Sequence, residues 1–313
     1  GTNTKIELSL LGNGLKTIDL SGLDDGTALF DPDAVSVTLG VTTQEEFNQV
    51  VMNMAALEAN GIYGLKAVAG SLTIDAKTAL EWIDQGVQFS AGDFVAQGEV
   101  LYEDALALAQ AGISLDKGAR VDASGESMSV GEALSLINSG ITLYSSDGES
   151  LSVSLETSDL VGGASTVIDH LLALANAGVG FMLPDSGTQT GNGLSYANDI
   201  LTLSNLNLDL GEVIQLQKAV NGGELAFSNT TVAITQNDLK KIIAGDTWGK
   251  DLVSMGIKSY VMPDGSLVTA AQANALLKLN SGINISGAQL SDTTLSATQA
   301  GYYAAHGLIP PVG

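Results

Sequence analysis

One short pattern recurs along this chain: an apolar helical run, then a glycine, then a branched apolar residue. Five of the seven intervals between successive copies fall within 25–28 residues, and the longest interval contains a degenerate copy near Gly223. A period of this length is typical of proteins built from small stacked units. The glycines are Gly61, Gly86, Gly112, Gly140, Gly178, Gly256, Gly282 and Gly307.

The glycines predict helix ends. A helix commonly ends with glycine in the left-handed conformation, and the residue after it packs on the last turn, five residues back. The two residues of this contact are apolar in seven of the eight copies, for example Trp82 with Val87 and Leu174 with Val179, and only Lys278 departs. Four capping boxes mark helix starts: Thr43 with Glu46, Ser129 with Glu132, Thr269 with Gln272 and Ser296 with Gln299. The sequence therefore predicts helices over 43–60, 76–85, 102–111, 130–139, 166–177, 236–244, 270–281 and 297–306.

Short stretches with alternating apolar residues follow the glycines. Examples are residues 113–115, 141–143 and 283–285, and a second stretch follows a turn, as at 72–74, 151–153 and 232–234. This alternation predicts half-buried strands, and Pro263-Asp-Gly265 is typical of a turn. One unit of about 26 residues cannot bury its apolar face alone. We therefore expect an α/β fold: an elongated solenoid of helix–glycine–strand–turn–strand units with short parallel strands. A compact two-domain α/β protein is the alternative.

The expected domain organisation has two parts. Residues 1–40 are β-like and are expected to form an N-terminal capping segment. Residues 41–313 are expected to form the solenoid, with an insertion at about 180–232 that is rich in glycine and asparagine. This insertion is either a flexible loop or an elaborated repeat.

Composition excludes several functions. The chain has 35 acidic and 12 basic residues, with Arg120 the single arginine, so its net charge is −23. Nucleic acids and anionic membranes require basic residues, so neither is expected as a partner. Cysteine is absent, which excludes disulfides and thiolate metal ligands. No apolar run is long enough to span a bilayer, so we expect no membrane insertion.

The glycine start and the ending without a stop signal suggest a segment of a longer protein.

Two pieces near the C-terminus carry a resemblance. Leu267-Val-Thr-Ala-Ala-Gln-Ala273, followed by Gly282-Ile283, and Leu295-Ser-Ala-Thr-Gln-Ala300, followed by Gly307-Leu308, resemble repeats of giant bacterial secreted proteins. These are proteins of the repeats-in-toxin and large-adhesin kind. The resemblance implies type I secretion and a location in the medium or on the bacterial cell surface. The calcium-binding nonapeptide of that group is absent here, so its calcium sites are not implied.

Acidic loops and one tryptophan are the candidate binding residues. Asp24, Asp25, Asp31 and Asp33 cluster near the N-terminus, and hard cations such as Ca²⁺ bind loops of this kind. A solvated acidic surface explains the same residues without a metal. Trp248 lies in the segment Asp246-Thr-Trp-Gly249 and is a candidate platform for stacking a sugar or another partner. No other cofactor is expected.

The two histidines do not indicate catalysis. His170 and His306 fall in predicted helices of different repeats, and no Gly-x-Ser-x-Gly nucleophile motif is present. We interpret His306 as a residue at a helix C-terminus, where the helix dipole favours a cation. We therefore expect no enzymatic activity.

The sequence predicts a non-enzymatic structural or interaction module of a secreted or surface-exposed bacterial protein, such as an adhesin stalk, a surface-layer element or a spacer. Two alternatives stay open. One is a solenoid that binds carbohydrate, a surface protein or another copy of itself. The other is a secreted enzyme acting on polysaccharides, which would need carboxylates that converge in a groove.

Overall fold

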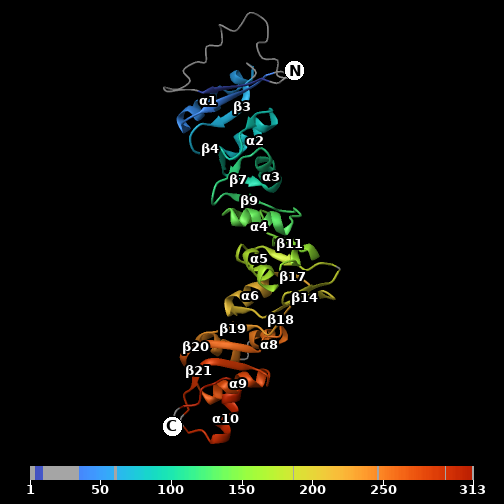
Figure 1. Cartoon of the computed structure of the whole chain (residues 1–313), viewed down its shortest axis with the longest axis vertical. Helices are drawn as coiled ribbons and strands as arrows, with labels where there is room; N and C mark the ends of the chain where they lie inside the picture. Colours follow the sequence, from blue (N-terminus) through green and yellow to red (C-terminus); the bar gives the residue numbers. More distant parts are fainter. Residues whose placement is uncertain are drawn as a thin grey trace, which may run out of the picture. The chain divides into compact units, whose positions relative to one another are not determined.

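The computed structural model describes residues 4–9, 35–59, 62–185, 187–244, 247–292 and 294–311. Side chains are described over the same ranges except at 4–9, 35–37, 55–59, 62, 247 and 248. These ranges form an α/β fold with ten α-helices and several sheets of short, mostly parallel strands. Groups of short strands lie between most neighbouring helices along the chain (Figure 1).

The ten helices include all eight that the sequence predicts. Two further helices, α6 and α8, lie between the predicted ones. The bounds are α1 Gln44–Ala59, α2 Ala76–Asp84, α3 Tyr102–Gln110, α4 Val130–Asn138, α5 Ala164–Asn176, α6 Leu210–Ala219, α7 Gln236–Ile243, α8 Thr247–Ser254, α9 Ala270–Leu279 and α10 Ala297–Ala305.

The helix ends follow the predicted glycine chemistry. In six copies the N–H of the residue after the glycine donates to the carbonyl five residues back, as from Val87 to Trp82 at 2.9 Å and from Val179 to Leu174 at 2.9 Å. The glycines of these six copies have positive φ. At Gly282 this bond is missing and φ is not positive, which agrees with the break at Lys278. Gly61 lies outside the described residues.

The chain divides into two units. The first contains residues 1–126 and 136–149, the second contains residues 127–135 and 150–313, and the division passes through α4.

Three parallel sheets are formed by the described residues of the first unit. Each pairs strands that lie roughly one repeat apart in the sequence. Their orders are β1 (Thr4–Ser9), β2 (Val35–Val41), β3 (Ile62–Ala67), β5 (Gln88–Phe89); β4 (Leu72–Asp75), β6 (Phe94–Gln97), β8 (Ser114–Leu115); and β7 (Glu99–Leu101), β9 (Arg120–Asp122), β10 (Thr142–Tyr144).

The second unit also has three sheets. Among its described strands, only the β13–β14–β15 pairings are antiparallel. The orders are β11 (Ser152–Ser154), β12 (Gly180–Met182), β17 (Val220–Gly222); β13 (Gln189–Gly191), β14 (Leu194–Ala197), β15 (Ile200–Ser204), β18 (Glu224–Ser228); and β16 (Asn207–Asp209), β19 (Thr231–Ala233), β20 (Ser259–Val268), β21 (Asn284–Leu290). Residues 180–232 thus carry strands and a helix rather than one long loop.

Each unit buries apolar side chains between its helices and strands. In the first unit, Trp82 of α2 lies against Phe47 and stacks on Phe89 with ring centroids 6.3 Å apart. Phe94 contacts Phe47 and Phe89, which completes the cluster. The core position expected for Trp82 is confirmed, since it is 5% exposed. Phe181, Tyr196, Phe227 and Tyr260 are buried in the second unit.

Among the described helices, none has both the length and the apolar character needed to cross a membrane.

Candidate functional site

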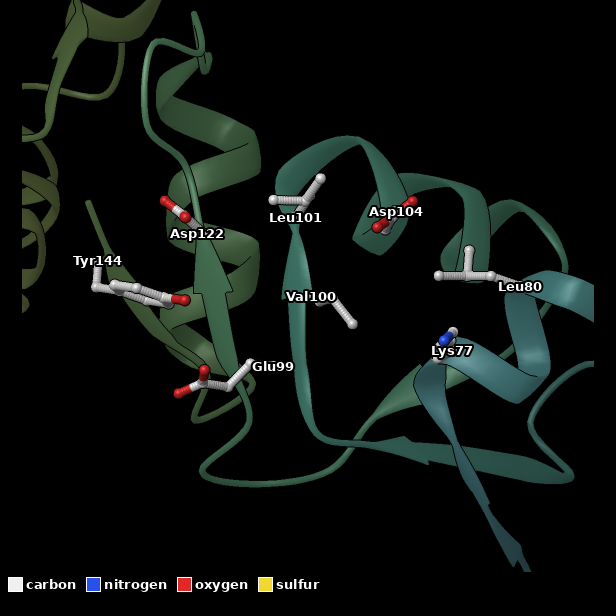
Figure 2. A pocket seen from close by; sticks show the side chains of 8 residues that line it. All are labelled: Lys77, Leu80, Glu99, Val100, Leu101, Asp104, Asp122 and Tyr144. Carbon is white, nitrogen blue, oxygen red and sulfur yellow. The ribbon is translucent and has the colours of Figure 1, made fainter. Parts of the chain in front are cut away.

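The first unit contains a polar pocket of about 280 Å³ at the ends of β7, β9 and β10. Lys77 and Leu80 come from α2 and Asp104 from the first turn of α3, whereas Asp122 and Tyr144 lie on the opposite side (Figure 2). Val100 and Leu101 of β7 separate the two groups in this view. Leu101 is 51% exposed, so an apolar surface lies beside the charged groups.

Strand register positions one wall of this pocket. Glu99 pairs with Arg120, and Arg120 pairs with Thr142, so the residues of three successive strands are aligned. The Arg120 guanidinium forms an ion pair with Glu99 and lies 4.1 Å from the centre of the Tyr144 ring. Both charged side chains are about half exposed, so we expect the ion pair to contribute at most ~1 kcal/mol of stability. The guanidinium thus contacts both Glu99 and the Tyr144 ring, two groups that line the pocket.

Two serine-rich turns hold carboxylates beside the pocket. Asp122 accepts hydrogen bonds from the hydroxyl of Ser124 and from the backbone N–H of Ser124 (3.1 Å) and Ser146 (3.2 Å). These bonds, the one with the Ser124 side chain above all, lower the pKa of Asp122 to about 2. The Ser145 hydroxyl likewise lowers the pKa of Asp147. Asp122 therefore stays ionised well into the acid range.

Chemically, the polar pocket can accept hydrogen bonds and attract cations. Its lining has three carboxylates, one lysine and one phenol, from Glu99, Asp104, Asp122, Lys77 and Tyr144. A lining of this kind suits the hydroxyl groups of a carbohydrate or a basic side chain.

The second unit contains a pocket of about 650 Å³, which we name the strand-end pocket. It lies where β16 and β19 end and α6 and α7 begin, with β20 alongside. Its apolar lining includes the buried side chains of Leu210, Ile234 and Met262. Polar groups of Asp209, Thr235, Asp238 and Lys241 also line it.

The structure leaves the predicted binding residues untested. Asp24, Asp25, Asp31 and Asp33 lie outside the described residues, so the calcium site stays a prediction. Within the described part of the chain, no group of three or more histidine, cysteine or acidic residues is placed to hold a metal ion. Trp248 lies on α8, but its side chain is not among those described.

The two histidines lie on different elements. His170 is on α5 and half-buried. His306 caps the C-terminus of α10, where its Nδ1 lies 2.8 Å from the carbonyl oxygen of Ile283 and its ring contacts Tyr302 edge-on. The predicted position of His306 at a helix C-terminus is confirmed.

Sequence reasoning missed both pockets. The available signal was the acidic or hydroxyl residue at the end of a strand, three positions before another acid, as in Asp209 with Glu212 and Thr235 with Asp238. That spacing predicts a helix start, but it does not reveal a cavity between successive repeats.

Comparison with known proteins assigns the chain to no family, since no family model, no curated protein and no solved structure matches it.

Proposed function

We propose that this chain is a stacked-repeat module, without enzymatic activity, of a secreted or surface-exposed bacterial protein. An adhesin stalk, a surface-layer element and a spacer are roles of this kind. The observation that carries the proposal is the parallel pairing of strands from successive repeats. Ser259 pairs with Asn284, and Thr231 pairs with Ser259, so the strands of these successive repeats share one ladder.

Contacts at the repeat glycines support stacking. The carbonyls of Gly112 and Gly140 accept hydrogen bonds, each 2.9 Å long, from the N–H groups of Gly92 and Gly118 in the neighbouring turns. A methyl group on Gly112 would lie 2.8 Å from the Cα of Ala91, and one on Gly307 would lie 2.6 Å from the Ile285 carbonyl oxygen. Backbones of successive repeats therefore approach closely, as expected where each unit covers the core of the next.

Charge supports an extracellular role. The net charge of −23 makes copies of the chain repel one another, which favours solubility. The absence of cysteine leaves no thiol to oxidise outside the cell. The resemblance to repeats of secreted adhesins points in the same direction.

Small-angle X-ray scattering tests the solenoid against the compact alternative. A compact chain of 313 residues has a radius of gyration of about 20 Å. Ten helices stacked 8–10 Å apart would form a rod of about 90 Å, with a radius of gyration of about 28 Å. A measured value near 20 Å would exclude the solenoid.

Binding and hydrolysis assays test the functional class. The carboxylates and Tyr144 of the polar pocket favour carbohydrate binding as the second candidate, so the purified chain should be applied to a glycan array. Saturable binding that is lost in Tyr144→Ala would establish this candidate. Release of reducing sugar ends from a polysaccharide panel would show an enzyme and overturn the non-enzymatic proposal.

A further inference from the structure

A bulge in β20 contributes to the strand-end pocket. The pairing of β20 with β21 runs from Val261 opposite Ser286 to Ser266 opposite Ala288. Four residues of β20, from Met262 to Gly265, therefore lie opposite Gly287 alone. The turn expected at Pro263-Asp-Gly265 is thus a bulge within one strand. Bulges re-aim side chains near functional sites, and this one brings Met262 and Pro263 to the pocket.

The interior of the pocket suits an apolar group. Leu210, Ile234 and Met262 are almost fully covered by the chain itself, at 4%, 2% and 1% exposed, so the apolar surface open to an occupant belongs mainly to the half-buried Ile214 and Val261. The volume of about 650 Å³ lies within the range of ordinary ligand pockets. It is large enough for one or two apolar side chains, and methionine adapts readily to different shapes.

The polar groups of the pocket disfavour an anion. Asp209 accepts the N–H of Glu212 at 2.8 Å, and Asp238 accepts the N–H and the hydroxyl of Thr235 at 2.8 and 2.6 Å. The chain's own side chains thus occupy donors at the starts of α6 and α7. Both carboxylates retain lone pairs that can accept further hydrogen bonds. Lys241 is the one basic residue in the lining, against two acids and a chain charge of −23.

From this complementarity we propose that the strand-end pocket binds a basic segment of a partner protein. An apolar side chain of the segment fills the pocket, and flanking lysine or arginine residues lie beside Asp209 and Asp238. The proposal rests on the interaction role given above and names the chemistry of the partner.

Isothermal titration calorimetry with a capped peptide Lys-Lys-Leu-Phe-Lys-Lys tests the proposal on the full chain. We expect saturable binding that weakens several-fold between 50 and 500 mM NaCl, because salt screens exposed charges. Peptides with glutamate in place of lysine, or serine in place of leucine and phenylalanine, should bind at least tenfold more weakly.

Two variants fill the pocket. Gly211 is the second residue of α6 and has no positive φ. A methyl group on it would lie 3.0 Å from Oδ1 of Asp209, so this carboxylate must shift slightly. Gly211→Leu should weaken peptide binding at least tenfold, both by filling the pocket and by displacing Asp209. Ala233→Phe on β19 should do the same from the other wall. Gly131→Leu is the matched control, since Gly131 is the second residue of α4 and has open space around it.

Three outcomes would overturn the pocket proposal: no saturable binding by the unmodified chain, equal binding of the glutamate peptide, or folded pocket variants that bind like Gly131→Leu. Circular dichroism confirms folding of each variant. The scattering measurement is independent of these results, so a failed pocket and a failed stacked module can be told apart.

Discussion

At the scale of single residues, the repeat glycines have two separate physical roles. Gly178 and Gly256 both follow a helix and both have positive φ, at 76° and 87°. Nothing lies within 4 Å of a methyl group added to Gly178, whereas one on Gly256 would overlap the carbonyl oxygen of Phe227. Glycine is therefore required at 178 only by the backbone conformation. At 256 it is also required by the close approach of the Phe227 backbone.

Alanine substitutions separate the two roles. Gly178→Ala should lower the free energy of unfolding by about 1–2 kcal/mol, the cost of the left-handed conformation. Gly256→Ala should cost at least ~1 kcal/mol more, because the Phe227 backbone must also move. Urea unfolding followed by circular dichroism measures both, and equal effects would show that the contact at Phe227 contributes nothing.

Tyr260 carries a hydroxyl group that finds no hydrogen-bond partner in the described part of the chain. Burial raises the pKa of this phenol to about 12. Because the folded-state pKa exceeds the ordinary value near 10, the folded state favours the neutral phenol. The stability that comes from keeping this phenol neutral is fully present below pH 10. The free energy of unfolding then falls as the pH rises from 10 to 12.

Replacing Tyr260 with phenylalanine removes an unsatisfied polar group. At pH 7 Tyr260→Phe should be neutral or should raise the free energy of unfolding by about 1 kcal/mol. Between pH 10 and 12 the variant should lose less stability than the unmodified chain. Urea midpoints at pH 7 and pH 11 check both expectations, and a clear loss at pH 7 would reveal a partner for the hydroxyl.

At the scale of elements, reciprocal caps define where helices begin. At α9, the Thr269 hydroxyl accepts the N–H of Gln272 at 3.1 Å, and the Gln272 side chain accepts the N–H of Thr269 at 3.0 Å. The same arrangement occurs at Thr43 with Glu46, Ser129 with Glu132 and Ser296 with Gln299. All four capping boxes predicted from the sequence are therefore confirmed.

Loss of the cap at α9 has a defined cost. Thr269→Ala should lower the free energy of unfolding by about 1 kcal/mol. The double variant with Thr269→Ala and Gln272→Ala should lose less stability than the sum of the two single losses, because either change alone already breaks the capping box. Asn274→Ala, at an exposed position of the same helix, should stay within ~0.5 kcal/mol. Thermal melting of the four variants tests this, and strict additivity would argue against a reciprocal cap.

At the scale of the whole molecule, the dominant electrostatic feature is the excess of acidic over basic residues, 35 against 12. Charges of one sign repel when the chain folds, and salt weakens this repulsion. We expect the melting temperature to rise between 10 and 500 mM NaCl. The same measurement in equal ionic strengths of KCl and NaCl controls for specific ion binding. A fall in melting temperature would show that attractive ion pairs outweigh the repulsion.

What the sequence determines by itself is local. A helix-ending glycine, the residue after it and the residue five positions before that one all lie within six consecutive residues. Trp82, Gly86 and Val87 could therefore be placed without knowledge of the rest of the chain. Capping boxes span four residues, from the N-cap to the third helical residue, and are equally readable. Helix α6 was missed because no repeat glycine had been assigned to its end, whereas the end of α8 was predicted at Gly256 and only its start was not.

Only the tertiary structure decided how the repeats pair. The pairing of Glu99 with Arg120 and the stacking of Arg120 on Tyr144 depend on strand register across successive repeats. The strand-end pocket depends on a bulge of β20 lying beside the starts of α6 and α7. Spacing within one repeat carries no record of such contacts, because they form between residues that only the folded chain brings together.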